Sequence, residues 1–99
     1  MLYAIIAEDN INSLELRKKY SQAHRQRLHQ LKADGRLVLA GPCPIADQDL
    51  SAQSGFSGSF IVIEFDSLEA AQDWANTDPF LIQGVYQKVT VKPFIQFLP

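Results

Sequence analysis

Hydrophobic residues in this chain fall into four short runs that predict β-strands and two longer periodic segments that predict helices. The runs are rich in β-branched and aromatic residues and are bounded by Gly, Pro, Asn or Asp, as strands usually are. The predicted strands are Leu2–Ala7, Leu37–Ala40, Ser59–Phe65 and Val85–Lys92. The predicted helices run over about Ser13–Ala33 and Asp66–Asn76, and a separate turn follows at Pro79.

Local signals place the ends of these elements. Asn12 with Glu15, and again Asp66 with Glu69, resembles a capping box at the start of a helix. Gly35 lies where a glycine commonly ends a helix. Both predicted helices therefore have a start signal, and the first also has a stop signal.

Proline and glycine mark the ends of the strands. Gly41–Pro44 closes the second strand, and Pro93 interrupts the last one, which predicts that this strand lies at a sheet edge or bulges there. Between them, Ile45–Gly55 is a polar loop that is long for a hairpin connection. The turn after the second helix begins with proline, and Thr77 or Asp78 is placed to cap it.

The order β-α-β-β-α-β predicts an α+β fold of the ferredoxin-like type. In that fold a four-stranded antiparallel sheet carries two helices on one face. Residues 1–99 are expected to form one domain, because a chain of 99 residues provides for a single core.

Both faces of the predicted sheet are apolar at their centres. The first strand places Leu2, Ala4 and Ile6 opposite Tyr3, Ile5 and Ala7, and the third places Phe60 and Val62 opposite Ile61, Ile63 and Phe65. Helices cover only one face, so the other would expose more apolar surface than a soluble monomer normally does. We therefore expect a homodimer with two sheets packed face to face, and a pocket lined by aromatic residues is the alternative.

Charge is distributed unevenly along the chain, whose net charge is −2. Ser13–Arg36 holds seven of the nine basic residues against two acidic ones, a net charge of +5 that leaves −7 for the remainder. A basic stripe can attract phosphates, although a solvated helix face is the commoner explanation. Nucleic-acid binding is not expected, because Ser54–Phe65 lacks the basic residue of an RNA-recognition motif and Glu64 would repel a phosphate chain.

The single cysteine, Cys43, excludes an internal disulfide, and we expect it to be a small buried side chain and not a thiolate nucleophile. The apolar run at the start of the chain meets Glu8 too early for a signal peptide, and no run approaches the ~20 residues of a membrane helix. A cytoplasmic protein with no membrane contact is expected.

The first predicted helix contains a histidine on its apolar side. One broad arc collects Leu16, Tyr20, Ala23, Leu28 and Leu31. His24 and Arg27 fall in the same arc. Imidazole, with an ordinary pKa near ~6.5, serves as a general acid or base, but a histidine at the core edge is an equal alternative. Asp78 is the best candidate for a carboxylate that orients the ring, unless it only caps the following turn.

Other chemistries find no support in the sequence. His24 and His29 are five residues apart, about 140° around a helix, so they cannot chelate one metal together. The glycine-rich segment Gly55–Ser59 lacks the lysine of a phosphate loop, and it leads into a strand instead of leaving one. We expect neither a metal nor a cofactor.

Several segments together resemble the YciI family, the YCII-related domain, from Met1 to about Phe94. They are Leu37–Pro42, Gly55–Ser59, Glu64–Ala71, Trp74, Asp78–Phe80, Gly84–Tyr86 and Val91–Phe94. The resemblance implies a dimeric α/β barrel, similar to that of muconolactone isomerase, and an active site centred on a histidine and an aspartate. His24 matches the histidine, Asp78 is the best match for the aspartate, and Gly58 and Ser59 match a strand start close to them.

The expected function is a small-molecule enzyme with a His–Asp acid–base site, of the isomerase, lyase or hydrolase type. Candidate substrate-binding residues are Ser59, Gly58, Arg27, Tyr20 and Phe80. Phe80 stands where tyrosine is common in the family, so a hydroxyl that could bind substrate is missing. The alternative is a dimeric module that binds a small ligand or a partner without transforming it.

Overall fold

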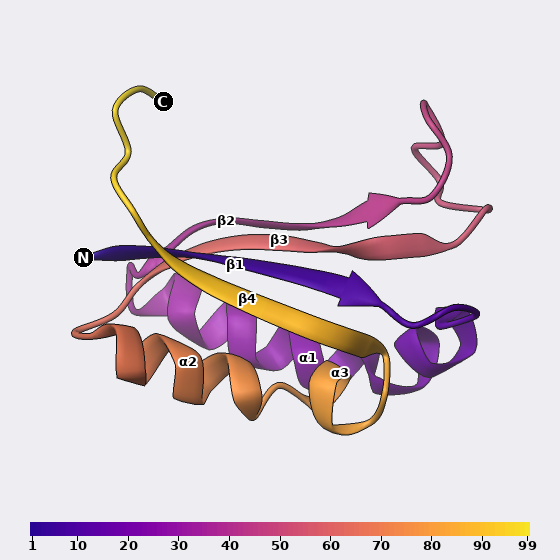
Figure 1. The fold of residues 1–99 in the computed structure, drawn as a ribbon, viewed down its shortest axis with the longest axis horizontal. Helices are drawn as coiled ribbons and strands as arrows, with labels where there is room; N and C mark the ends of the chain where they lie inside the picture. Colours follow the sequence, from indigo (N-terminus) through magenta and orange to yellow (C-terminus); the bar gives the residue numbers. More distant parts are fainter.

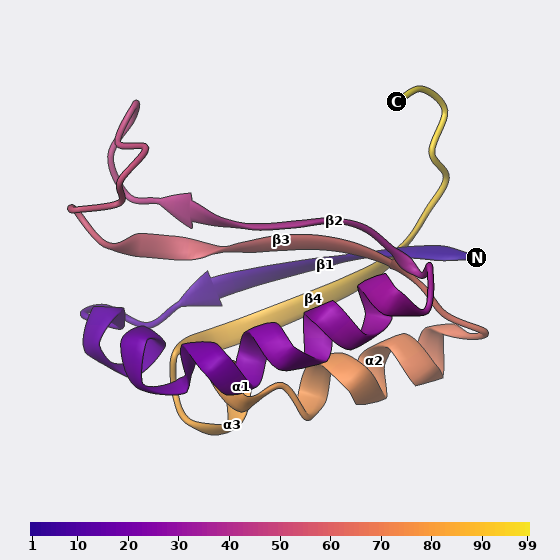
Figure 2. The same ribbon diagram turned by 180° about the vertical axis from the view of Figure 1, so that it is seen from behind.

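The computed structural model describes residues 1–99 and contains a four-stranded antiparallel sheet with helices on one face (Figure 1). The elements are β1 (Leu2–Asp9), α1 (Leu14–Ala33), β2 (Leu37–Pro44), β3 (Phe56–Glu64), α2 (Leu68–Asn76), α3 (Pro79–Ile82) and β4 (Tyr86–Phe94). The strand order is β2-β3-β1-β4, and Figure 2 shows α1 and α2 side by side beneath the sheet. The predicted ferredoxin-like α+β fold is confirmed. No helix is both long and apolar enough to span a bilayer.

The strands extend further than the sequence pattern predicted. β2 continues through Gly41–Pro44, and β3 begins at Phe56 instead of Ser59. The prolines are tolerated because β2 is an edge strand that pairs only with β3. Pro93 likewise lies within β4, at the opposite edge, which confirms the edge-strand prediction for that element.

The predicted N-cap of each helix was one residue too early. Asn12 has a left-handed backbone (φ 62°), and Ser13 takes the N-cap position of α1. The Ser13 hydroxyl does not cap the helix but donates to the Asp9 carboxylate at 2.5 Å. At α2 the cap is Ser67, not Asp66, and its hydroxyl accepts a backbone N–H at 3.0 Å.

The end of α1 confirms the predicted glycine stop. Gly35 has φ +73°, a conformation that residues with a Cβ rarely adopt. Its N–H donates to the carbonyl of Lys32 at 3.0 Å, and the N–H of Arg36 donates to that of Leu31 at 3.0 Å. This pair of bonds is a Schellman motif, which satisfies helix carbonyls while the chain turns into β2.

The core lies between the helices and the face of the sheet that they cover. Its main cluster consists of Tyr3, Ile5, Leu31, Ile61, Ile63, Phe65, Ala71 and Ala75. A second, smaller cluster surrounds α3 and contains Ala7, Phe80, Val85 and Tyr86. The candidate site is built on this second cluster.

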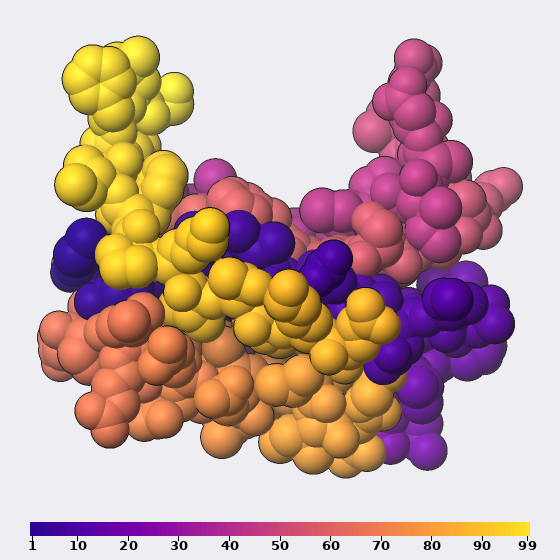
Figure 3. Space-filling view, viewed as in Figure 1, coloured from indigo at the N-terminus to yellow at the C-terminus, as the bar shows by residue number.

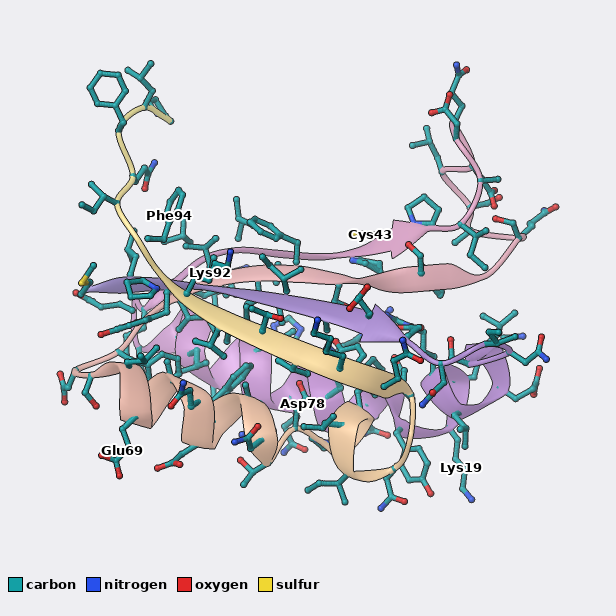
Figure 4. The ribbon with its side chains drawn as sticks, viewed as in Figure 1. Lys19, Cys43, Glu69, Asp78, Lys92 and Phe94 are labelled. Carbon is teal, nitrogen blue, oxygen red and sulfur yellow. The ribbon has the colours of Figure 1, made fainter.

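The opposite face of the sheet has no cover and is partly apolar, as the alternation predicted. Its exposed apolar residues include Ile6, Leu39, Phe60 and Phe94, which are 38–47% exposed. Figure 4 shows Phe94 pointing away from the helices. Two arms, residues 45–55 and 95–99, rise on this side at opposite ends and leave a saddle between them (Figure 3). We call this surface the open face.

Substitution of Gly58 tests how closely the backbones of β1 and β3 approach each other. A Cβ built on Gly58 would lie 2.0 Å from the carbonyl oxygen of Ala7, whereas one on Gly41 would meet nothing within 4 Å. We expect Gly58→Ala to destabilise the protein by about 3 kcal/mol, because the obstructing atom belongs to the backbone and cannot rotate away. Gly41→Ala, the matched control in β2, should change stability by less than about 0.5 kcal/mol. Urea unfolding measures both, and equal midpoints would contradict the close approach.

Candidate active site

His24 and Asp78, which are far apart in the sequence, form a hydrogen-bonded pair. The Nδ1 atom of His24 lies 2.9 and 3.0 Å from the two carboxylate oxygens of Asp78. The side chains are only 10% and 4% exposed, so water competes little for this contact. An ionised carboxylate can only accept hydrogen bonds, so in the neutral imidazole the hydrogen is on Nδ1 and the lone pair is on Nε2. In this tautomer Nε2 is the atom that can act as a base.

The carboxylate of Asp78 has two partners. Asp78 is the N-cap of α3, and its Oδ1 accepts the backbone N–H of Phe80 at 2.9 Å while the carboxylate holds His24. Figure 4 shows Asp78 at the junction between α2 and α3, beneath β4. One side chain therefore both caps α3 and orients the imidazole of His24.

Aromatic rings fix the plane of the imidazole. Phe80 stacks on His24 with ring centroids 4.0 Å apart and planes 8° from parallel. The ring of Tyr86 is perpendicular to both rings, with its centroid 6.2 Å from that of His24 and 5.5 Å from that of Phe80. With Nδ1 anchored and one ring face covered, the imidazole has little freedom to turn.

The unbonded side of His24 faces a cavity of about 830 Å³. The Nε2 atom makes no hydrogen bond within the chain, and it is not one of the two buried side-chain atoms that lack a partner. The cavity lies between α1 and β2, and Ser59, Ile61 and Phe80 also line it. Its volume is in the range of small-molecule sites, about 300–1,000 Å³. The lone pair of Nε2 is thus available to a bound molecule.

Arg17 is a buried residue of the cavity that sequence reasoning missed. Its guanidinium donates to both carboxylate oxygens of Asp9, at 2.6 and 2.8 Å, and to the Ser59 hydroxyl and the Gly58 carbonyl, each at 3.0 Å. It also lies over the rings of Phe56, Phe80 and Tyr86, at 4.6, 5.1 and 5.8 Å. One cation therefore joins the end of β1, the start of β3 and the aromatic platform of His24.

A signal for Arg17 was present in the sequence. Arg17 precedes His24 by seven residues, which is nearly two helical turns, so both point to the same side of α1. Its seven-residue spacing from His24 was hidden among the other basic residues of the segment.

Gly58 and Ser59 lie next to this cluster, where the family resemblance placed them. Ser59 is 4% exposed and lines the cavity, and Gly58 contributes its carbonyl oxygen to Arg17. Tyr86 is close by, with a buried hydroxyl that has no hydrogen-bond partner. Burial, together with the nearby charge of Asp78, raises the pKa of Tyr86 further above its ordinary value, so the phenol is harder to ionise than an exposed tyrosine.

Three predicted substrate-binding residues, Gly58, Arg27 and Tyr20, do not line the cavity. Arg27 stacks on Trp74, 4.5 Å from the ring centroid, and donates to the Trp74 carbonyl and the Thr77 hydroxyl. Partial burial lowers the pKa of Arg27, while the charge of Asp78 raises it. Tyr20 packs against the cluster around α3. Both side chains support the elements that carry the site.

Two further residues differ from expectation. His29, about 140° from His24 around the helix, also lines this cavity. Cys43 is exposed on the edge strand β2, so the prediction of a buried side chain was wrong. The structure contains no group of three or more His, Cys, Asp or Glu side chains that could hold a metal ion.

The sequence and fold have clear relatives. The family model of the YCII-related domain matches residues 1–95. Protein YciI of Escherichia coli is 50% identical over 94 residues, covering 95% of this chain and 96% of its own, and an uncharacterized protein of Haemophilus influenzae is 46% identical over the same length and shares. Among solved structures, the 5-chloro-2-hydroxyhydroquinone dehydrochlorinase of Burkholderia phenoliruptrix, in complex with 2,5-dihydroxybenzoquinone, has a TM-score of 0.85 at 27% identity and covers 96% of this chain and 94% of its own.

Because the Asp78 carboxylate accepts hydrogen bonds from two groups, its substitution should lower the free energy of unfolding. Asp78→Ala removes the acceptor for both His24 and the N–H of Phe80, and we expect a loss of about 2–3 kcal/mol. Asp78→Asn keeps an oxygen acceptor and should lose less than about 1 kcal/mol. Urea unfolding at constant slope gives both values. Asp66→Ala, an exposed aspartate outside the cap of α2, is the control, and equal losses for the two Asp78 variants would contradict the double role.

Proposed function

This chain belongs to the family of the YCII-related domain, and from that premise we propose that it is a cytoplasmic enzyme that transfers protons on a small oxygen-rich metabolite. The observation that carries the proposal is the His24–Asp78 pair. Its Nδ1–carboxylate distance is 2.9 Å, and Nε2 is left free toward a cavity large enough for such a molecule. The arrangement supports general acid–base catalysis by His24.

The proposed reaction begins when Nε2 of His24 takes a proton from an activated C–H or O–H of the substrate. The electron pair of that bond moves into the carbon skeleton and forms an enolate-like anion. The proton then returns at another atom, which is an isomerisation, or a leaving group departs with an electron pair, which is an elimination. Asp78 stabilises the imidazolium that exists between the two steps.

Arg17 and Ser59 are placed to stabilise the anion. The Ser59 hydroxyl accepts a hydrogen bond from Arg17 at 3.0 Å, which leaves its own hydrogen for the neighbouring Tyr86 hydroxyl or for a substrate oxygen. Arg17 lends positive charge to that hydroxyl, although Asp9 offsets part of it. Preformed donors of this kind lower the barrier because they need no reorganisation when charge develops.

The structural relative supports a ring-shaped substrate. The dehydrochlorinase, whose name describes an elimination, was solved with a dihydroxybenzoquinone bound. A flat hydroxylated ring fits the aromatic side of this cavity, where Phe56 and Phe80 lie against Arg17. Hydroxylated aromatics, quinones and lactone-like compounds are therefore the first compounds to assay.

Turnover tests the role of His24. On any compound of this panel that the wild type converts, we expect His24→Asn to lower kcat by about 10²–10⁴-fold, the usual contribution of a general acid–base group. Absorbance of the ring and release of the leaving group follow the reaction. Cys43→Ser is the control and should retain the wild-type rate. An undiminished rate in His24→Asn would exclude the proposed role, and binding without conversion across the panel would favour a ligand-binding module.

We further propose that the open face packs against the open face of a second copy of the chain. Exposed apolar residues lie at its centre, and the arm of residues 95–99 adds Ile95, Phe97 and Leu98, which are 71–89% exposed. In a single chain these three side chains have little apolar contact. A second sheet seated in the saddle between the two arms would cover both the centre and the arms (Figure 3).

The oligomeric state tests this packing. Sedimentation at micromolar concentration should give twice the 11.1 kDa mass of the chain. Phe60→Asp should give a folded monomer, because a carboxylate would be buried against the second sheet. Leu68→Asp is the matched control, since Leu68 is 37% exposed against 38% for Phe60 but lies on α2, away from the open face. A wild-type mass of one chain would contradict the proposal.

A further inference from the structure

The wall of the cavity that α1 contributes is basic. No Asp or Glu lines this cavity, although the chain as a whole has a net charge of −2. Its cationic and imidazole side chains, all from α1, are Arg17, Lys18, His24, Arg25, His29 and Lys32. The basic stripe found in the sequence is therefore not simply a solvated helix face, because one side of it lines the cavity.

Three of these cations form a row along the rim. Lys18, Arg25 and Lys32 follow one another at intervals of seven residues, so each lies about 10 Å from the next on the same side of the helix. All three are exposed, whereas His24, next to Arg25 in the sequence, is buried. Arg25 thus stands at the rim where the His24–Asp78 pair faces the cavity.

The positive charge of the row is mostly unpaired. Arg17, deeper in the cavity, is neutralised by Asp9 at 2.6 Å. Lys18 lies 3.8 Å from Glu15, in a contact that is largely exposed and therefore weak. Arg25 and Lys32 form no salt bridge. Free cationic charge is concentrated around Arg25 and Lys32.

The opposite wall is uncharged. On β2 it consists of Leu37, Ala40, Gly41 and Pro42. A ligand with one apolar side and one anionic end could place its carbon skeleton on β2 and its charge on α1. A cleft with one sign of charge and low-dielectric walls also concentrates ligands of the opposite charge.

We propose that the substrate of the proposed reaction carries a carboxylate or phosphate group, which Arg25 and Lys32 bind at the rim, with His29 between them, while the reacting atom lies at Nε2 of His24. The inference rests on the proposed function, because it gives that site a substrate class. His29 and Lys32 lie about 8 and 12 Å from His24 along the helix, so the anionic group is separated from the reacting atom by several bonds. Arg25 and Lys32 are then specificity-determining residues.

Binding of simple probes tests the inference without any turnover. Benzoate, phenyl phosphate and the neutral benzamide are titrated into the ¹⁵N-labelled protein, and the amide shifts of Ala40 and Gly41 are followed. We expect both anions to bind more tightly than benzamide, and the stronger of the two identifies the group as carboxylate or phosphate. Added salt should weaken both, because the rim cations are exposed. Benzamide binding equal to that of both anions would overturn the proposal.

Matched variants locate the charge. Arg25→Gln and Lys32→Gln should each weaken anion binding up to about five-fold, the range of an exposed ion pair, and leave benzamide binding unchanged. Lys19→Gln removes the same charge from α1 outside the cavity and should have no effect. A loss with Lys19→Gln equal to that with Arg25→Gln would show a general effect of net charge and would overturn the assignment to the rim. Displacement of phenyl phosphate by a DNA oligonucleotide at equal phosphate concentration would also overturn it, in favour of nucleic acid.

His24→Asn separates this inference from the proposed function. The variant should still bind the anionic probe, because the rim row is intact. If the wild-type protein binds the anions but converts no compound, the anion site is supported and the proposed enzymatic function is contradicted. If it converts neutral compounds as fast as their carboxylated analogues, the enzymatic function is supported and the anion site is contradicted.

Discussion

The site depends on a buried carboxylate that accepts hydrogen bonds from two directions. Asp78 ends the connection after α2, starts α3 through the N–H of Phe80, and holds the imidazole of His24. Because Phe80 in turn stacks on His24, the short helix places both the anchor and the platform of the ring. A four-residue helix contributes little stability of its own. Its position is set by this polar contact and by the apolar cluster beneath it.

The buried Arg17–Asp9 ion pair beside the cavity has a cost in solvation free energy. Their side chains are 9% and 1% exposed, and burying two charges costs several kcal/mol of solvation that their attraction only partly returns. Four hydrogen bonds from the guanidinium offset much of that cost. An apolar pair of similar size would fill the space at least as well. The charges are therefore better explained by a role in the cavity than by a contribution to the stability of the core.

Much of the fold could be read from the sequence, because it depends on local patterns. Alternation in the first and third strands, the stop at Gly35 and the edge position of the strand with Pro93 follow from backbone chemistry alone. The ends of β2 could not, since proline is tolerated in a strand only when that strand lies at an edge, which is a property of the whole sheet. In the same way, the pairing of His24 with Asp78 was anticipated from chemistry and family resemblance, whereas Arg17 needed Asp9 and Ser59 beside it to stand out from its basic neighbours.

The prolines of β2 have one further consequence. Pro42 and Pro44 have no N–H, so the free edge of β2 beside the cavity is a poor template for an incoming strand from another molecule. Pro93 blunts the other border in the same manner. The prolines of both edge strands therefore disfavour strand-by-strand association of this chain into ribbons or fibrils, including at the edge beside the cavity.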